Sequence, residues 1–224
     1  MAGTLAVKPL GVDLSSWQGK VDFQKLKSKI SFVYIRAGVS SNYRDPSCDA
    51  FREGCRRVDL PFGLYWGLSP GKDIKKHARS FFSVWDADPG RLPPAFDFEL
   101  TNSLPRTKLQ RWLHGVYSAF GELAQLELQG MATYTSTGFL NRYLPTTSWL
   151  KYTQLWVAHW TPDALPLIPE EWRKNGFTWR FWQYSNMGVG EDYGVSSRFI
   201  DLDRFNGTFD ALLQRTELVN GSVE

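Results

Sequence analysis

Cysteine and histidine are scarce in this chain of 224 residues, which has two of the first and three of the second. Cys48 and Cys55 lie seven positions apart in a segment with a helical pattern. Seven residues at about 1.5 Å per residue separate them by roughly 10 Å, which is too far for a disulfide bond in a continuous helix. We therefore expect free, partly buried thiols.

The sequence also lacks the spacings that hold metals. There is no C-x-x-C motif, and His77, His114 and His159 are scattered along the chain without a zinc-binding pattern. His77 and His114 fall on helical segments, where we expect them to be structural or exposed. No metal and no cofactor are expected.

Long runs of one character are missing too. No window of about 18 apolar residues occurs, so no membrane span is predicted. Lys and Arg form no dense run and the net charge is only +3, so binding of nucleic acid is not indicated. The first residues do not combine a basic segment with an apolar run, so no secretory signal is predicted there.

Aromatic residues, in contrast, are abundant, at 15% of the chain with ten Trp. A buried Trp needs a partner for its N–H, so Trp is a costly residue to use for packing alone. Two explanations are open. We favour an unusually aromatic core, and the alternative is a cleft whose rings stack on flat ligand faces.

A short apolar strand, a polar turn and a helix recur through the first two thirds of the chain. Eight strands are predicted, the number in a closed parallel barrel: Pro9–Leu14, Phe32–Ala37, Phe62–Leu68, Ala95–Leu100, Gly130–Thr135, Leu155–His159, Arg180–Tyr184 and Phe199–Leu202. The helices predicted between the early strands are Asp22–Lys29, Pro46–Arg57, Asp73–Trp85 and Thr107–Leu126.

The pattern weakens after the fifth strand. A short helix is predicted at Gly138–Tyr143, a loop at Thr161–Gly176, which has three prolines, an ordered loop at Ser185–Arg198, and a closing helix at Phe209–Arg215. The fold class is therefore α/β: a TIM-like (β/α) barrel of eight strands with an incomplete set of outer helices in its C-terminal half.

The expected organisation is one domain. Residues 1–9 are read as an N-terminal extension, residues 10–215 as a catalytic barrel, and residues 216–224 as a polar tail. No internal linker or repeat interrupts the barrel.

The most informative segment is PPAFDFEL, residues 93–100. Side chains alternate between the two faces of a strand, so Phe96, Phe98 and Leu100 should point to one side and Asp97 and Glu99 to the other. An acidic pair facing the interior near the C-terminal mouth of a barrel is costly, because burial and like charge both oppose ionisation. Two further strands end in an acid between apolar neighbours: GVDLS contains Asp13 and FIDLD contains Asp201.

Barrel active sites are assembled from the C-terminal ends of several strands, so these acids indicate one site. Carboxylates without His or Cys ligands fit a divalent metal or glycoside hydrolysis, which needs one protonated and one charged carboxyl. The aromatic residues on or near the strand ends favour a sugar substrate, and about half of them should belong to the core: Tyr65, Trp66, Tyr134, Trp156, Trp160, Trp182 and Tyr184.

Taken together, the motifs resemble those of the family 25 glycoside hydrolases, lysozymes found in phage endolysins, bacteria and fungi. The resemblance runs from about Leu10 to Gly207. Its motifs are GVDLSSWQG (11–19), FVYIRAG (32–38), FGLYWGL (62–68), FDFE (96–99), TYTS (133–136), LWVAHW (155–160), FWQYS (181–185) and IDLDRFNG (200–207). The resemblance implies a β/α barrel with missing late helices and cleavage of the β-1,4 bond between N-acetylmuramic acid and N-acetylglucosamine.

The same resemblance implies roles for individual residues. Glu99 matches the general acid, Asp97 its neighbour that orients the 2-acetamido group or stabilises developing positive charge, and Asp13 and Asp201 the flanking acids. The substrate-binding candidates are Tyr65, Tyr134, Trp160, Gln183 and Arg36. Many relatives have Tyr-His where this chain has Tyr65-Trp66, so the sugar contacts there are expected to differ.

Several alternatives stay open at this point. They are a hydrolase of another N-acetylhexosamine polymer, a non-catalytic glycan-binding protein on the same barrel, and a metal-dependent carboxylate enzyme. The expected partner is a peptidoglycan strand, the expected assembly is a monomer, and the expected place of action is the bacterial cell wall. With no signal in the chain, the expected route is holin release of a phage endolysin or another form of export.

Overall fold

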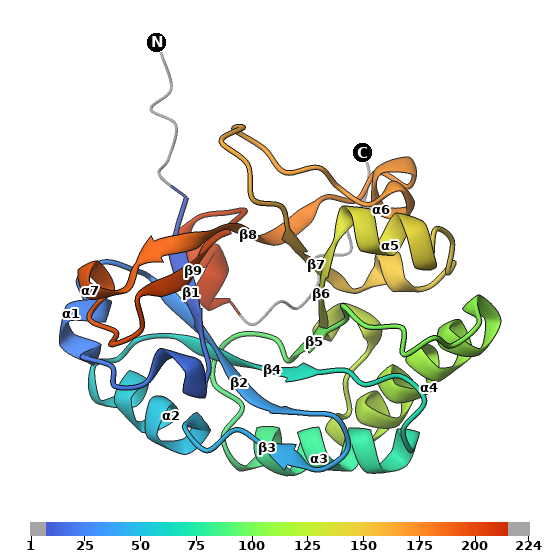
Figure 1. The fold of residues 1–224 in the computed structure, drawn as a ribbon, viewed down its shortest axis with the longest axis horizontal. Helices are drawn as coiled ribbons and strands as arrows, with labels where there is room; N and C mark the ends of the chain where they lie inside the picture. The colour runs from blue at the N-terminus through green and yellow to red at the C-terminus, as the bar shows by residue number, and fades with distance from the viewer. Residues whose placement is uncertain (1–7, 215–224) are drawn as a thin grey trace.

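The computed structural model describes residues 8–214, in which eight strands close into a barrel (Figure 1). The barrel strands are β1 (Leu10–Leu14), β2 (Phe32–Val39), β4 (Phe62–Gly67), β5 (Ala95–Asp97), β6 (Ala132–Ser136), β7 (Gln154–Ala158), β8 (Trp179–Val189) and β9 (Phe199–Phe205). Their order around the barrel is β1-β9-β8-β7-β6-β5-β4-β2, and pairing of β1 with β2 closes the ring. A two-residue strand that was not predicted, β3 (Tyr43–Arg44), folds back on the end of β2. The predicted fold class is confirmed.

The expectation of an all-parallel barrel was wrong for the last strand. From β1 through β8 neighbouring barrel strands run parallel, but β9 runs antiparallel to both β8 and β1. Antiparallel strands can be joined by a short connection, whereas a parallel crossover needs about a dozen residues or more. The nine residues between Val189 and Phe199 allow a return but leave little room for a crossover helix.

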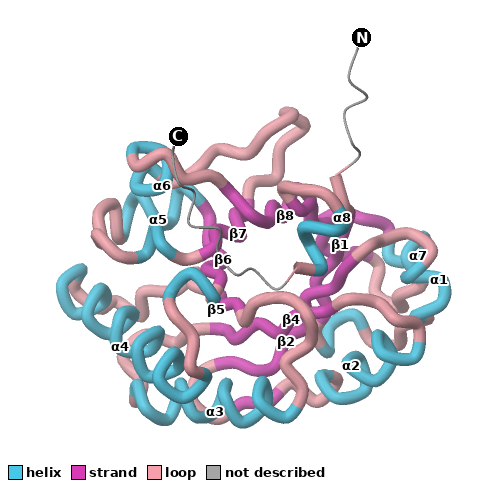
Figure 2. The backbone as a smooth tube through the Cα atoms, turned by 180° about the vertical axis from the view of Figure 1, so that it is seen from behind, coloured by secondary structure: helices cyan, strands magenta, loops and turns pink. Residues whose placement is uncertain are grey.

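The helices predicted in the first half of the chain are present with ends shifted by a few residues. They are α1 (Phe23–Lys27), α2 (Cys48–Arg57), α3 (Ile74–Ala87) and α4 (Arg106–Ala124). Side chains of Asp22 and Asp73 cap the backbone N–H groups that begin α1 and α3. The apolar face of α4 is buried except for Leu123, which is exposed near the end of the helix. Figure 2 shows α2, α3 and α4 packed along one side of the strands.

The second half has smaller helices: α5 (Thr137–Tyr143), α6 (Glu170–Lys174), α7 (Gly190–Tyr193) and α8 (Phe209–Leu213). Three short 3-10 helices, η1 (Ser16–Gln18), η2 (Leu128–Gly130) and η3 (Leu150–Tyr152), complete the described elements. Both α5 and α8 match predicted helices.

Two segments predicted as loops contain regular structure. In the proline-rich segment, α6 follows Pro169 and has two Glu in its first turn and Arg and Lys in its last, which favours a helix. Beyond Ser185, β8 continues to Val189 by pairing with β9 through two register shifts, and α7 follows. These hydrogen bonds come from tertiary pairing, which local composition does not report.

Apolar side chains fill two layers. Inside the barrel, a small cluster of rings includes Phe32, Tyr34, Trp156 and Phe181. The larger cluster lies between the barrel and its helices, where Trp66 stacks on Phe81 of α3. The aromatic core that the composition favoured is therefore present.

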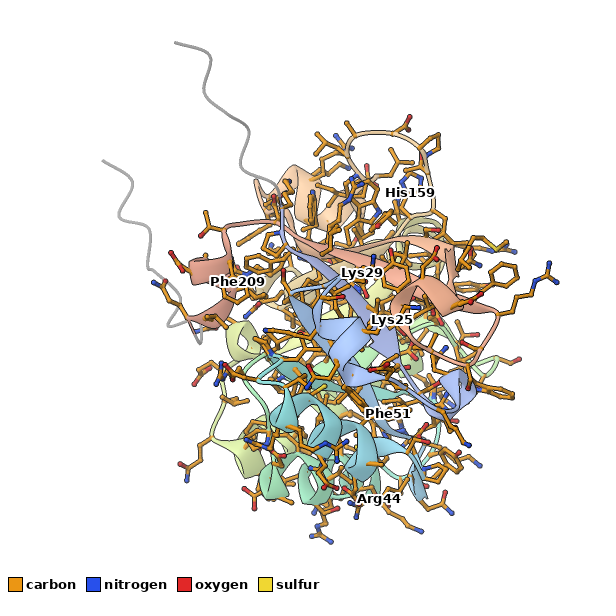
Figure 3. The ribbon with its side chains drawn as sticks, turned by 90° about the vertical axis from the view of Figure 1, so that its left-hand side faces the viewer. Lys25, Lys29, Arg44, Phe51, His159 and Phe209 are labelled. Atoms are coloured by element: carbon orange, nitrogen blue, oxygen red, sulfur yellow. The ribbon has the colours of Figure 1, made fainter. Side chains whose placement is uncertain are left out.

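The two cysteines are free thiols, as the helical spacing predicted. Both are fully buried, whereas partial burial was expected. In the described part of the chain, no helix is both long and apolar enough to cross a membrane. The predicted tail at 216–224 and most of the predicted extension at 1–9 fall outside the described residues. Figure 3 shows Arg44 near the bottom of the molecule and His159 in its upper part, because β3 extends from β2 and His159 follows β7, which lies opposite β2 in the ring.

Candidate active site

A pocket opens at the C-terminal ends of the parallel strands. Its lining includes residues on or just beyond every barrel strand but β2, so strands distant in sequence converge on one point. The lining residues are Asp13, Tyr65, Asp97, Glu99, Tyr134, Trp156, Gln183 and Asp201. All four predicted catalytic acids thus lie in one pocket.

The predicted strand around the central acidic pair is shorter than expected. It ends at Asp97, because β5 pairs with its neighbours only over Ala95–Asp97, and Glu99 lies beyond its end. Phe96 and Phe98 are buried as alternation predicts, but Leu100 is half exposed because the chain has left the sheet by then. The backbone N–H of Phe98 still donates to the carbonyl oxygen of Tyr134, which holds Glu99 near the sheet.

Burial sets the protonation of the acidic pair. It raises the pKa of Asp97 well above the usual range, the charge of Glu99 raises it further, and the guanidinium of Arg36 partly offsets both. Burial also raises the pKa of Glu99, and the charge of Asp201 adds to this. The pocket therefore favours the protonated forms of Asp97 and Glu99 over two separate charges.

Gln183 connects the acid of the first strand to two aromatic residues. Its Nε2 donates to Oδ2 of Asp13 over 2.8 Å, and its Oε1 accepts from the hydroxyl of Tyr134 at 2.9 Å and from Nε1 of Trp160 at 3.0 Å. Burial and the charges of neighbouring Asp residues raise the pKa of Asp13, while the bond from Gln183 lowers it. The orientation of the amide is thus fixed by three partners.

The last strand contributes a fifth acid that the sequence reasoning missed. Asp203 lies two residues beyond Asp201 on β9 and is completely buried. Burial raises the pKa of Asp201 to about 6 and that of Asp203 to about 8. The signal was available, because alternation places Asp203 on the same face as Asp201.

Three aromatic side chains, Tyr65, Tyr134 and Trp156, line the pocket beside the acids. The rings of Tyr65 and Tyr134 stand edge-to-face against the indole of Trp156, with centroids 6.0 and 4.8 Å away. Trp66 points to the opposite side of its strand and is buried against α3, so the Tyr65-Trp66 departure leaves Trp66 away from the pocket. Trp182 is also buried, as expected for about half of these aromatic residues.

Two of the predicted substrate-binding residues are not among the lining residues. Trp160 is 58% exposed at the rim and reaches the site through its bond to Gln183. Arg36 of β2 forms an ion pair with the buried carboxylate of Asp45 at 2.7 Å and donates to the hydroxyl of Ser16 at 3.2 Å. Its positive charge nevertheless acts on Asp97, as its effect on the pKa shows.

No group of three or more His, Cys, Asp or Glu side chains arranged to hold a metal ion is found among residues 8–214. The pocket combines a carboxyl pair, an amide and aromatic rings, a set of groups that suits hydrolysis of a glycosidic bond.

Comparison with known proteins agrees with this geometry. The sequence model of the glycosyl hydrolases family 25 matches residues 12–193, a range that contains every lining residue except Asp201. The chain belongs to family 25 of the glycosyl hydrolases. It is therefore a glycoside hydrolase, and the family resemblance of its motifs is confirmed.

Individual members of the family are similar over most of the chain. Lysozyme M1 of Streptomyces globisporus is 30% identical over 219 residues, which cover 91% of this chain and 69% of that protein. The crystal structure of a bacterial lysozyme from Streptomyces coelicolor superposes with a TM-score of 0.77 at 28% identity, covering 92% of this chain and 96% of the other. The spore cortex lytic enzyme SleM of Clostridium perfringens superposes with a TM-score of 0.75 at 26% identity, covering 92% of this chain and 69% of the other.

Proposed function

We propose that this family 25 hydrolase is a 1,4-β-N-acetylmuramidase in which Glu99 is the general acid. The enzyme is a peptidoglycan hydrolase of the lysozyme kind, as its family and its lysozyme relatives support. The observation that carries the assignment to Glu99 is its place beside Asp97 in a pocket that raises its pKa. A raised pKa keeps the carboxyl protonated at a pH where an exposed Glu has lost its proton.

In the first step, Glu99 donates its proton to the oxygen of the glycosidic bond, and the bond from that oxygen to the anomeric carbon breaks. The acetamido oxygen of the substrate then bonds to the anomeric carbon until a water replaces it, or the water attacks that carbon directly, and Asp97 assists by orienting the acetamido group or stabilising the positive charge. In the acetamido route, the bond from the acetamido oxygen to the anomeric carbon breaks as the water oxygen bonds to that carbon. In both routes Glu99, now ionised, accepts the proton that this water loses and returns to its starting state.

The flanking acids adjust this pair. The charge of Asp201 raises the pKa of Glu99, which favours the protonated form that the first step needs. Asp13 is oriented by Gln183, whose amide is held in turn by Tyr134 and Trp160. We assign Asp13 and Asp201 to tuning the site and holding it together.

Sugar binding is assigned to the rings around the acids. Tyr65 and Tyr134 line the pocket, and the exposed indole of Trp160 lies at its rim. Flat apolar faces beside hydrogen-bonding groups suit the two-sided character of a pyranose ring. Arg36 is assigned an indirect part in binding, through its charge beside the acidic pair.

The test is release of soluble fragments from purified peptidoglycan by wild type and by Glu99→Gln, with borohydride reduction and mass spectrometry of the new ends. Reduced muramic acid ends that fall at least a hundredfold in Glu99→Gln are expected, since general acid catalysis contributes about 10²- to 10⁴-fold. Glu122→Gln is the matched control, because Glu122 is exposed on α4 and does not line the pocket.

Other outcomes would contradict the proposal in distinct ways. Reduced glucosamine ends would make the enzyme a glucosaminidase, and cleavage of chitin in preference to peptidoglycan would change the substrate. No product from folded wild type would favour a glycan-binding protein. Loss of activity on addition of a chelator would indicate a metal-dependent site.

We also propose that the chain acts as a monomer on the bacterial cell wall. This chain itself supplies all four predicted acids, so the acid set needs no second copy. Light scattering of the purified protein at the concentration used for the activity measurement tests this, and a dimer there would contradict it.

A further inference from the structure

Asp203 has an environment unlike that of the four acids in the pocket. It is completely buried on β9, with Gly11 of β1 and Gln183 of β8 as its neighbours in register. It is absent from the residues that line the pocket, so it lies beneath them within the barrel. Burying a carboxyl group costs free energy unless the group forms hydrogen bonds or ion pairs.

One oxygen of the Asp203 carboxyl accepts a hydrogen bond and the other accepts none. Oδ1 accepts from Nε1 of Trp156 over 2.8 Å, whereas Oδ2 is buried without a hydrogen-bond partner in the described structure. An indole N–H in an apolar interior needs an acceptor, and Asp203 supplies it for Trp156.

No ion pair to Asp203 is found in the described part of the chain. The titratable groups whose charges interact with Asp203 are Asp13 of β1, Asp201 of β9, Tyr34 of β2 and Tyr184 of β8, and none of them is a cation. The charges of two arginines act on these tyrosines, that of Arg180 on Tyr34 and that of Arg204 on Tyr184. A negative charge at Asp203 would therefore be buried without compensation, beside two other acids.

Trp156 links this carboxyl to the substrate pocket. Its ring lines the pocket and stacks on Tyr34, with centroids 4.4 Å apart. On its other sides stand Tyr65 and Tyr134, the two rings assigned to sugar contacts. The position of the indole therefore determines the surface against which both tyrosine rings pack.

We propose that Asp203 is a positioning residue of this active site, which holds the indole of Trp156 in place through a carboxyl that stays protonated in the working enzyme. The inference rests on the proposed glycosidase function for its effect on catalysis, but the protonated state is a property of the fold alone. Asp203 touches no reacting atom, and it acts through Trp156 and, by staying uncharged, through Asp13 and Asp201.

The activity test compares Asp203→Leu with Asp203→Asn. Leucine removes the acceptor and leaves the indole N–H unsatisfied, so kcat/KM on peptidoglycan is expected to fall at least tenfold. Asparagine keeps a neutral acceptor of the same shape, so it is expected to recover most of that loss. In a Trp156→Phe background, which has no N–H to satisfy, Asp203→Leu should cost at most twofold more. Equal losses for Asp203→Asn and Asp203→Leu would overturn the proposal.

A stability measurement tests the protonated state without relying on activity. Burial raises the pKa of Asp203 to about 8, above the ordinary value of 3.8, so between these values the unfolded chain ionises while the folded protein does not. Wild type should therefore lose stability relative to Asp203→Asn as pH rises from about 4 to 8. The urea midpoint of the variant should exceed that of wild type by a margin that grows over this range.

A difference that is constant with pH would overturn the proposal, since it would show a purely structural role. These results are distinguishable from failure of the proposed function. If wild type yields no muramic acid ends, the enzymatic proposal fails, while the pH dependence of the two midpoints still decides whether Asp203 is protonated.

Discussion

Nε2 of Gln183 donates to Oδ2 of Asp13 over 2.8 Å, across the strand β9 that separates their own strands. Because two further donors hold Oε1 of the same amide, its orientation is fixed and Asp13 meets an N–H rather than a carbonyl oxygen. This arrangement makes Gln183 a link between the rim of the pocket and its acids.

Replacing Gln183 by Leu should lower kcat on peptidoglycan about tenfold or more while the protein still folds. The bond from Gln183 lowers the pKa of Asp13, so its loss should raise that pKa and shift the acidic limb of the kcat/KM profile to higher pH. The measurement is the pH profile of both proteins on the same substrate. An unchanged acidic limb would show that Asp13 need not be ionised.

Replacing Trp160 by Ala should raise KM about three- to tenfold, the range expected for loss of one aromatic contact. Trp160→Phe, which keeps a ring but has no N–H for Gln183, should recover KM more than kcat. Tyr152→Ala is the control, because Tyr152 is similarly exposed but lies in η3, before the start of β7 and away from the mouth. Equal effects of the Trp160 and Tyr152 changes would contradict a sugar contact at the rim.

Arg36 and Asp45 allow the charge of the arginine to be separated from its ion pair. Arg36→Met removes the positive charge that lowers the pKa of Asp97, so the acidic limb of kcat/KM should move to higher pH. Asp45→Asn also breaks the pair but leaves the charge, so its acidic limb should not move in that direction. Both variants should lose about 3 kcal/mol in free energy of unfolding, since each breaks a buried ion pair.

His77 should make the protein sensitive to mild acid. Burial lowers its pKa from 6.5 to about 4, and its Nε2 accepts from the backbone N–H of Ser69, which requires the neutral ring. Because the unfolded chain binds a proton in this interval and the folded protein does not, stability falls as pH drops from about 6.5 to 4, by about 2 to 3 kcal/mol in all.

The check is urea unfolding at pH 7 and at pH 4.5 for wild type and His77→Phe. The variant keeps a ring against Trp112 and should lose less stability on acidification than wild type. His114→Phe serves as the control, since His114 is exposed on α4, and it should behave as wild type. An equal pH dependence of stability in all three proteins would show that His77 is not the cause of the loss of stability in acid.

The elements that alternation controls could be predicted from the sequence. Period-two burial placed Asp97 and Glu99 on the inner face and Phe96 and Phe98 on the outer one, as found. Asp13 and Asp201 followed from the same argument. Asp203 lies on the same face, but it is followed by the charged Arg204, whereas apolar residues flank Asp13 and Asp201 on both sides.

Features that depend on distant partners could not be predicted. The direction of β9 follows from its pairing with β8 and β1, and the continuation of β8 past Ser185 follows from the same ladder. The guanidinium of Arg36 is paired with Asp45 and is not part of the pocket lining, and the hairpin of β2 and β3 brings these two residues together.

The position of β9 has a consequence for how the enzyme matures. This strand lies between β1 and β8 and carries two of the five acids, so neither ring closure nor the full acid set exists until the chain has been synthesised past Phe205. Contacts between the first and last strands of a domain are slow to form because the loop they close is long. A chain interrupted before β9 would have an open sheet edge and an incomplete set of acids. Loss of β9 would therefore abolish both the closed barrel and the hydrolase activity.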